Sequence, residues 1–459
     1  MRLAARGGTT ASSGYNLRMK VCFWGTRGSI AKPGPSTLRY GGNTSCVELR
    51  AADGTLIVLD CGTGAHALGL SLASGRQPVR GNLLIGHTHW DHIQGFPFFA
   101  PLFEAGSVWS VYAPGGGDRK FQASLAGQMA YEYSPINIDA LHAELRYHDM
   151  VEGVFEIGSV RITTHYLHHP ALTLGFRFEA DGATVVYACD HEPHSLYPLD
   201  AAPGTAPVHH EDRRHVEFLK GADLIIHDAQ YCMADFPEKV GWGHTPLERA
   251  VDYAILARTR HLVFTHHDPE RDDDAIDALC ELARERASGA EHVPEISAAQ
   301  EGQTIDVSGD GTRPPFRLSE PSAFPSREPR KAATVLIVDD DPDLLLLLET
   351  ALRADGLRVL CAADGDRALE LARAQPPSLI LLDMQLPTRN GMEVCRALRS
   401  EQDARLRDVP ILVLTGMKLK ETDLVAAFIA GATDFLTKPI KPTLVRSRVR
   451  SWLLRTVPR

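Results

Sequence analysis

The sequence predicts an α/β protein in which a β-rich N-terminal domain is followed by a doubly wound (βα)5 domain. With 459 residues the chain is longer than one ordinary domain of roughly 100–200 residues. All 20 histidines lie at or before His292, and a 22-residue stretch with five prolines, 309–330, separates this region from the rest. Such a stretch is typical of an extended linker rather than a surface loop. We expect a disordered N-terminus at 1–18 and domains at 19–308 and 331–459.

The N-terminal region alternates short β segments with glycine-rich turns. We expect strands, in order, at Leu56–Leu59, Leu83–Ile85, Val160–His165, Thr184–Ala188, Leu224–His227 and Leu262–Thr265. Two helical patterns follow at Pro246–Arg258 and Asp273–Arg286. Thr245 stands immediately before the first of them and is a plausible N-cap.

The C-terminal region alternates strand and helix patterns regularly. We expect its strands at Val335–Val338, Val359–Ala362, Leu379–Leu382, Ile411–Leu414 and Phe435–Thr437. Helical patterns fall between them. Five βα units of this spacing indicate a doubly wound parallel sheet, whose functional crevice lies beyond the carboxyl ends of the strands.

Composition excludes several classes of protein. The formal net charge of −10 gives no reason to expect DNA or an anionic membrane as a partner. No apolar run approaches the ~20 residues that a membrane-spanning helix needs, and the first residues lack the apolar core of a signal peptide. The eight cysteines form no C-x-x-C pair, which indicates reduced thiols. We therefore expect a cytoplasmic protein.

The strongest chemical signal is the segment His87-Thr88-His89-Trp90-Asp91-His92, directly after an apolar strand pattern. Four potential ligands in six residues cannot all face one side of a strand or helix, so a loop that wraps a metal fits them better. Imidazole and carboxylate ligands suit zinc or another borderline divalent ion. The absence of thiolates argues against a closed structural zinc site.

Further candidate ligands stand at the ends of other strand patterns, namely His168-His169, Asp190 and His266-His267. Any one of them alone would more often be a surface or hydrogen-bonded residue. Successive strand ends can meet at one rim of a sheet, so the set is more informative than its members. Spacing favours His169 over His168 and His266 over His267, and both choices remain open.

On these residues the N-terminal region resembles the metallo-β-lactamase fold, an αββα sandwich, specifically its phosphodiesterase and tRNA 3′-processing ribonuclease branch. The motif Leu59-Asp60-Cys-Gly-Thr-Gly upstream supports the resemblance. It implies one metal held by His87, His89 and His169, and a second held by Asp91, His92 and His266, with Asp190 bridging them. It also implies that His244 protonates the leaving oxygen or contacts the phosphate.

We take Asp91 and His244 as the catalytic candidates. Two adjacent divalent cations, zinc or manganese, would acidify a water molecule and offset phosphoryl charge. Asp60 is expected to hydrogen-bond a ligand imidazole rather than a metal, although a turn residue is the alternative. The segments Gly25-Thr-Arg-Gly-Ser and His227-Asp228-Ala favour the phosphodiesterase branch.

The sequence does not distinguish a cyclic nucleotide from an RNA end, but the absence of a long basic arm favours a small phosphodiester substrate. Two other readings stay open. One is a thioester or lactam hydrolase of the same fold, and the other is a signalling scaffold that binds metal without turnover. The complete set of ligands argues against the scaffold.

The C-terminal region carries a second cluster, of carboxylates at strand ends. Asp339 and Asp340 follow the first strand pattern and Asp383 follows the third. Carboxylates so close together repel each other unless a hard cation such as Mg²⁺ joins them. One of them could act as a nucleophile toward a phosphoryl donor, with Lys438 neutralising the added charge and Thr415 donating a hydrogen bond to it.

This pattern resembles the receiver domain of two-component response regulators, over essentially all of 331–459. The resemblance implies that Asp383 accepts the phosphoryl group and that Asp339 and Asp340 support magnesium. It implies that the switch residues are Thr415, Phe435 and Lys438. A cognate histidine kinase or phosphotransfer protein would be the partner. Because the sequence ends at Arg459, just after the last helix pattern, we expect phosphorylation to modulate the metal domain upstream, through a possible homodimer or altered docking, in a direction left open.

Overall fold

The computed structural model describes residues 18–115, 120–194, 201–309, 333–416 and 421–456. The expected disordered N-terminus lies outside the described residues except for Arg18, and the expected linker lies outside them except for Gly309. None of the helices in the described ranges is long and apolar enough to span a membrane. The eight cysteines are all described and form no disulfide.

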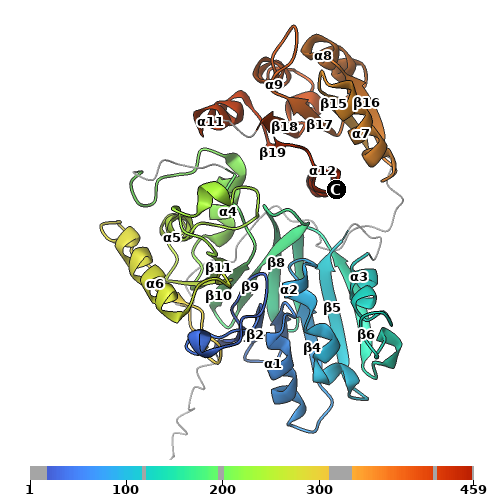
Figure 1. Cartoon of the computed structure of the whole chain (residues 1–459). Coiled ribbons are helices and arrows are strands. Elements are labelled where there is room, and N and C mark those ends of the chain that lie inside the picture. Colours follow the sequence, from blue (N-terminus) through green and yellow to red (C-terminus); the bar gives the residue numbers. More distant parts are fainter. Residues whose placement is uncertain (1–17, 116–119, 195–200, 310–332, 417–420, 457–459) are drawn as a thin grey trace, which may run out of the picture.

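The N-terminal domain consists of two seven-stranded sheets packed face to face, with helices on both outer faces (Figure 1). The first sheet has the order β14 (Thr304–Val307), β1 (Met19–Gly25), β2 (Cys46–Arg50), β3 (Leu56–Leu59), β4 (Arg80–Leu84), β5 (Val108–Pro114) and β6 (Glu144–Met150). The second has the order β13 (Glu295–Ala298), β12 (His261–Thr265), β11 (Leu224–Asp228), β10 (Ala183–Ala188), β9 (Thr173–Ala180), β8 (Val160–Leu167) and β7 (Gly153–Ile157). The αββα sandwich predicted from the sequence is confirmed.

Three apolar cores separate these layers. One lies between the two sheets and includes Phe23 and Phe176, both fully buried. A second lies between the first sheet and its covering helices, α1 (Gly64–Ala73) and α3 (Lys120–Gln128). The third lies between the second sheet and α4 (His210–Leu219), α5 (Leu247–Leu256) and α6 (Asp273–Ala287). Strands β3 and β11 are buried along their whole length because both faces are covered.

The direction of the strands explains where a site can form. Strands β10, β11 and β12 run parallel, and β8 runs in the same direction because the antiparallel β9 lies between β8 and β10. Their carboxyl ends therefore lie at one edge of the second sheet. The short helix α2 (Trp90–Ile93) follows β4 of the first sheet.

The strands predicted from the sequence are all present, with ends that differ by up to three residues. The predicted N-cap at Thr245 is wrong, because the helix α5 begins at Leu247 and Pro246 occupies the cap position. The Thr245 side chain donates its hydroxyl hydrogen to the carbonyl of His191 instead. Its hydrogen bond therefore joins two loops of the sandwich rather than capping the helix.

The C-terminal domain is a five-stranded parallel sheet with helices on both faces, as predicted. Its strands have the order β16 (Arg358–Ala362), β15 (Thr334–Val338), β17 (Leu379–Asp383), β18 (Ile411–Gly416) and β19 (Asp434–Lys438). Its helices are α7 (Pro342–Arg353), α8 (Gly365–Ala374), α9 (Gly391–Arg399), α10 (Ala404–Arg407), α11 (Glu421–Ala430) and α12 (Pro442–Thr456). Counted along the chain, the five strands have the order 2-1-3-4-5, which is that of a flavodoxin-like sheet.

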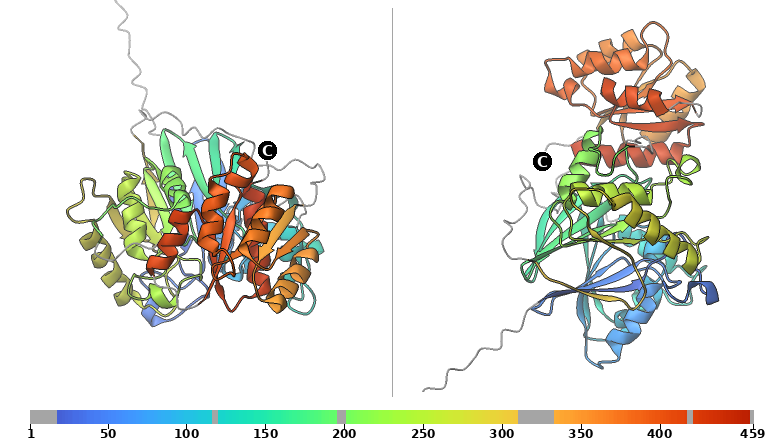
Figure 2. Two further views of the ribbon diagram at one scale, coloured as in Figure 1. Left: turned by 90° about the horizontal axis from the view of Figure 1, so that it is seen from above. Right: turned by 90° about the vertical axis from the view of Figure 1, so that its left-hand side faces the viewer.

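The two domains are in contact through α12 and β19, which face the loops at the ends of β8 and β10 (Figures 1 and 2). The Arg455 guanidinium donates to the carbonyl of Leu167 at 3.0 Å, and its Nη1 lies 3.8 Å from the Glu211 carboxylate on α4. The Ser447 hydroxyl donates to the carbonyl of Pro170. The contacts with Leu167 and Pro170 fall within three residues of His169, so the C-terminal domain rests on the rim where the histidines gather.

Candidate metal centre

Seven side chains from four segments converge at this rim, and each segment follows a strand; Asp91 and His92 lie in the short helix α2. His87, His89, Asp91 and His92 follow β4, His169 follows β8, Asp190 follows β10 and His266 follows β12. They are the seven residues that the sequence analysis took as ligands. Within the cluster they form two groups with ligand atoms close together, one of His87, His89, His169 and Asp190, the other of Asp91, His92 and His266.

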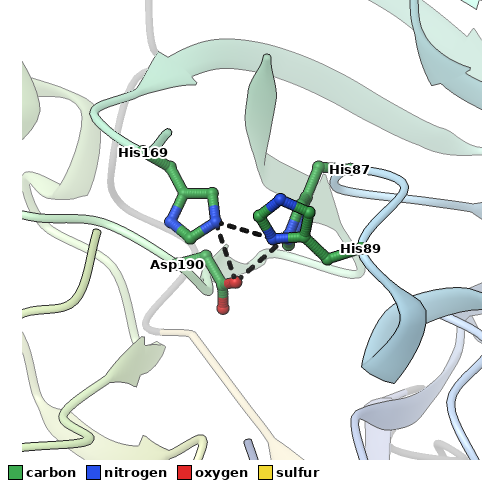
Figure 3. A group of neighbouring side chains, drawn as sticks. All are labelled: His87, His89, His169 and Asp190. Atoms are coloured by element: carbon green, nitrogen blue, oxygen red, sulfur yellow. Dashed lines mark hydrogen bonds and ion pairs between the residues drawn. The ribbon is translucent and has the colours of Figure 1, made fainter. Parts of the chain in front are cut away.

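The first group surrounds the Oδ2 atom of Asp190 (Figure 3). His87 Nε2 lies 3.3 Å and His169 Nε2 lies 3.6 Å from this oxygen. His169 Nε2 also lies 3.1 Å from His89 Nδ1. The three imidazoles therefore direct one nitrogen each toward a common point beside the carboxylate.

The second group surrounds His266 and the other oxygen of Asp190. His266 Nε2 lies 3.1 Å from Asp91 Oδ2 and 3.2 Å from Asp190 Oδ1. His92 Nε2 lies 3.3 Å from Asp91 Oδ2. Asp190 Oδ1 thus faces His266, whereas Asp190 Oδ2 lies 3.3 Å from both His87 Nε2 and His92 Nε2, so this one carboxylate contacts both groups.

The donor set fits two divalent cations. Ligand atoms held about 2.0–2.2 Å from a tetrahedral ion stand about 3.4 Å apart, and the spacings within the cluster range from 3.1 to 3.6 Å. The buried Nε2 atoms of His87 and His92 have no hydrogen-bond partner among the described residues. Buried polar nitrogens normally find partners, so these two are placed for a ligand of another kind.

The structure distinguishes the two histidine pairs that the sequence left open. His169 and His266 enter the cluster. His168 directs Nδ1 to the carbonyl of Glu192 at 2.8 Å, and its Nε2 lies 3.3 Å from Asp434 of the C-terminal domain. His267 donates from Nε2 to the carbonyl of Ala299 at 2.9 Å.

Burial and charge set the protonation of these groups. Burial lowers the pKa of His87 and of His169 well below the usual value, so both imidazoles are neutral near pH 7, the state that binds a metal. Burial disfavours the carboxylate form of Asp190, but His266, His92 and His87 outweigh it and hold its pKa well below the usual value. His87 and His169 therefore present neutral nitrogens beside an ionised carboxylate. Burial lowers the pKa of His92, but Asp91, Asp190 and Asp60 outweigh burial and raise it well above the usual value.

Asp60 connects three groups behind the cluster. Its Oδ2 lies 2.8 Å from His92 Nδ1 and accepts from the Tyr187 hydroxyl at 2.6 Å, and its Oδ1 accepts from the Gly86 amide at 2.8 Å. This contact fixes which nitrogen of His92 faces the cluster, as expected of a carboxylate that orients a ligand. Tyr187 was not anticipated from the sequence, where a strand tyrosine reads as a core residue.

His244 lies beside the cluster, and its ring stacks on that of His266 with centroids 4.9 Å apart. Its Nδ1 lies 3.0 Å from the Asp228 carboxylate, which also accepts from the Thr245 amide. Burial lowers the pKa of His244, but Asp228 outweighs burial and raises the pKa to about 9. The sequence alone indicates Asp228 only through its position directly after the predicted strand Leu224–His227.

Three backbone features hold the loops in place. Asp60, Asp190 and His266 have φ values of 59°, 63° and 63°, in the left-handed region that residues with a side chain seldom adopt. A Cβ atom at Gly28 would lie 2.3 Å from His266 Nδ1, so glycine is required there. Glu192, which the sequence analysis missed, accepts from the amides of Gly241 and Gly243 and so fixes the loop that carries His244.

The carboxylates of the C-terminal domain also meet, at the carboxyl ends of β15 and β17. Lys438 Nζ donates to Asp339 Oδ2 at 2.9 Å and to Asp383 Oδ2 at 3.0 Å. Burial opposes the charge on Lys438, but these two carboxylates outweigh it and raise its pKa. Asp339 and Asp383 are buried, whereas Asp340 is exposed.

The expected switch residues lie near by. Thr415 is buried at the end of β18, where it pairs in register with Thr437. Phe435 is half-buried in β19, with its ring 6.2 Å from that of Phe428. Lys438 ends the same strand, so β19 carries both an expected switch aromatic and the lysine that pairs with Asp383.

Comparison with known protein families assigns both domains. Residues 55–267 match a family model described as a beta-lactamase superfamily domain, and residues 335–450 match one described as a response regulator receiver domain. The chain thus joins a beta-lactamase superfamily domain to a receiver domain. We refer to these as the hydrolase-fold domain and the receiver domain.

Curated relatives match the receiver domain. The DNA-binding response regulator MtrA of Mycolicibacterium smegmatis is 41% identical over 121 residues, which are 26% of this chain and 50% of MtrA. The alkaline phosphatase synthesis transcriptional regulatory protein PhoP of Bacillus subtilis is 40% identical over 122 residues, which are 27% of this chain and 49% of PhoP. The chain therefore spans about half the length of the curated relatives it matches.

Solved structures match each domain in turn. The metallo-beta-lactamase fold protein YhfI of Bacillus subtilis is 19% identical, with a TM-score of 0.45, over 63% of this chain and 99% of that one. Human tRNase Z, short form, is 20% identical, with a TM-score of 0.42, over 63% and 99%. A putative response regulator of Chloroflexus aurantiacus is 36% identical, with a TM-score of 0.25, over 27% and 98%.

Proposed function

We propose that the protein is a response regulator whose output is a dinuclear-metal phosphodiesterase, modulated by phosphorylation of Asp383. The observation that carries the proposal is the division of seven ligands into two groups that share Asp190. Such a pair of sites suits zinc or manganese. When bound, two adjacent divalent cations acidify water and stabilise negative charge on phosphoryl oxygens.

The residues around the two groups have distinct tasks in this proposal. Asp91 binds a cation and accepts a hydrogen bond from the Ser29 amide at 2.7 Å, which orients the carboxylate. His244, held by Asp228, is placed to donate a proton to the leaving oxygen of the substrate. Asp60 keeps the His92 ring in the orientation that directs Nε2 into the cluster.

Contacts along β19 support the proposed control by phosphorylation. Lys438 at one end of this strand pairs with Asp383, and Asp434 at the other end lies 3.3 Å from His168. A five-residue strand spans about 13 Å, so the phosphorylation site is one short strand away from the residue next to His169. A phosphoryl group on Asp383 adds negative charge beside Lys438 and so changes the balance at one end of that strand.

The direct experiment compares His87→Ala/His89→Ala with the wild type. Zinc content and hydrolysis of a bis-aryl phosphate, a cyclic nucleotide, a thioester and a lactam are measured for both. We expect the wild type to bind two metal ions and to cleave phosphodiesters, and the variant to lose both properties. His66→Ala removes an exposed histidine outside the cluster and is the matched control.

The outcomes of this panel separate the three readings. Cleavage of the thioester or the lactam alone would show that the protein is a thioester or lactam hydrolase of the same fold. Metal binding without any turnover would favour a signalling scaffold. Unchanged turnover of the phosphodiester in the double variant would refute the site.

Control by phosphorylation has its own test. A histidine kinase or phosphotransfer protein is the proposed donor, and acetyl phosphate with Mg²⁺ can replace it in vitro. We expect the wild type to be labelled and Asp383→Asn not to be. Equal hydrolase activity with and without the donor, over a series of protein concentrations, would refute the coupling.

A further inference from the structure

A cavity of about 340 Å³ lies between the two domains. The hydrolase-fold domain lines one side of it with His87, Thr88 and Ser124. The receiver domain lines the other side with Arg446, Ser447 and Arg450, all on α12. Its volume falls within the range of small-molecule sites, about 300–1,000 Å³. The cavity thus adjoins the metal-ligand loop and is completed by the second domain.

The receiver side of this cavity is cationic. Its helix α12 contains four arginines and no acidic residue. The Arg446 guanidinium donates to the Asp355 carboxylate through Nε at 2.7 Å and also through Nη2, and Asp355 lines the cavity together with Arg446 and Arg450. Guanidiniums on a cavity wall favour an anion with planar or tetrahedral oxygens.

The position of this helix is fixed by contacts across the domain boundary. Ser447, one residue from Arg446, donates to the carbonyl of Pro170, the residue after His169. Further along α12, the Arg455 guanidinium lies over the Tyr166 ring at 5.2 Å and bonds the carbonyl of Leu167. The arginines on the cavity wall are therefore held at a set place relative to the metal-ligand loops.

We propose that this cavity is the substrate pocket and that Arg446 and Arg450 of the receiver domain bind a second anionic group of the substrate. The inference rests on the proposed phosphodiesterase function and narrows its substrate class. The substrate is a small phosphodiester with an additional phosphate group. One end of it is cleaved at the metal-ligand loop, and the additional phosphate lies against α12.

The test uses the full-length, zinc-loaded protein and two chromogenic substrates. Thymidine 3′-(4-nitrophenyl phosphate) carries the cleavable ester alone, and its 5′-phosphorylated form carries the additional phosphate. In both, a water oxygen bonds to phosphorus, the bond from phosphorus to the nitrophenyl oxygen breaks, and 4-nitrophenol and the phosphomonoester result. We measure the ratio of the two KM values, which cancels any general loss of activity.

We expect wild-type KM to be lower for the 5′-phosphorylated substrate, and Arg446→Ala/Arg450→Ala to reduce this preference about 10–100-fold. The lysine pair Arg446→Lys/Arg450→Lys should restore part of it because the charge is kept. Arg405→Ala/Arg407→Ala removes two exposed arginines of α10, outside the cavity, and is the matched control. A preference that is unchanged in the alanine pair would overturn the inference.

Calorimetry separates failure of the pocket from failure of the enzyme. Thymidine 3′,5′-bisphosphate and thymidine 3′-monophosphate are titrated into the same variants, without any turnover. Tighter binding of the bisphosphate that disappears in the alanine pair supports the pocket even if no ester is hydrolysed. Equal binding of both ligands by the wild type refutes the pocket even if esters are cleaved.

Discussion

The two charged sites of this chain are built on the same topological rule and differ in their surroundings. Both lie beyond the carboxyl ends of parallel strands, where loops deliver side chains to one edge. Six of the seven residues of the histidine cluster are buried, with His87, His92, His169 and Asp190 each at most 3% exposed, whereas His89 is exposed. In the receiver site Asp339 is buried and Asp340 is exposed, and Lys438 lies between the carboxylates of Asp339 and Asp383.

The difference in burial suits the histidine cluster to cations that stay bound and the receiver site to charged groups that exchange. His169, held neutral by burial and bonded through its second nitrogen to the carbonyl of Gly243, and His92, oriented by Asp60, suit cations that stay in place. A site in which Lys438 pairs with Asp339 and Asp383, next to the exposed Asp340, suits a magnesium ion and a phosphoryl group that come and go. The following changes test this contrast, from the largest expected effect to the smallest.

The largest effect is expected at Asp190, which both metal groups share. Asp190→Asn removes the charge that joins them, so we expect a loss of both metal ions and a fall of about 10³-fold in phosphodiester turnover. Metal content and kcat are the measurements. Asp306→Asn, at an exposed carboxylate paired with Lys20, is the control. A variant that keeps two metal ions would contradict the bridging role.

A smaller effect is expected at Asp60, which contacts the cluster only through its hydrogen bond to His92. Asp60→Asn leaves all seven ligands but weakens the hold on His92, so we expect metal affinity to fall by about 10–100-fold. Competition with a chelator measures it. Tyr187→Phe removes only the hydroxyl bonded to Asp60 and should fall between the variant and the wild type. Equal metal affinity in the wild type and both variants would indicate that Asp60 is only a turn residue.

The receiver site should respond more weakly to the same change. Asp340→Asn alters an exposed carboxylate, so we expect the domain to fold normally and to need about tenfold more Mg²⁺ for phosphorylation of Asp383. Labelling from acetyl phosphate across a magnesium series gives the value. Asp343→Asn, an exposed aspartate in the first turn of α7, is the control. An unchanged magnesium requirement would remove Asp340 from the site.

The interface between the two domains should make the stability of the protein depend on pH. His209 packs its ring 4.6 Å from Phe428 of the receiver domain, and its other neighbours are His194, His210, Asp212 and Glu211. Burial, and then His194, lower its pKa to about 3. A histidine with a lowered pKa in the folded state contributes stability above about pH 6.5, and this contribution is lost as pH falls toward 3.

We therefore expect the wild type to lose about 1 kcal/mol more stability than His209→Asn between pH 7.5 and 5.5. Asparagine keeps the side-chain acceptor for the amide of Glu211 at the start of α4 and removes the titrating ring. Denaturant titrations at the two pH values measure the difference. The same loss in both proteins would assign the pH dependence to other groups.

The sequence was informative where local chemistry and local structure coincide. The segment from His87 to His92 and the aspartates after β15 and β17 are short motifs at strand ends, and the structure brings each of them to one edge. The roles assigned to those residues remain proposals. The parallel sheet followed from the regular alternation of strand and helix patterns, whereas the sandwich was implied by the resemblance to the metallo-β-lactamase fold.

Features set by distant packing could not be read from the sequence. Neighbouring residues such as His168 and His169 alternate in direction, and only the folded rim decides which of them meets the cluster. Glu192 and Asp228 act through hydrogen bonds to loops far away in the chain. The edge strand β6, with sequence ELRYHDM, is half polar and lacked a clear strand pattern.

The dipeptide His168-His169 has a consequence for how interchangeable the two domains are. The His168 ring contacts Asp434 of the receiver domain, and the His169 ring is part of the histidine cluster. A receiver from another regulator, grafted in place of this one, would need an aspartate at the start of its last strand and an arginine near the end of its last helix. We expect a substituted receiver domain without these two residues to fold but not to dock on the hydrolase-fold domain. The sequences of the two domains are therefore expected to have changed together.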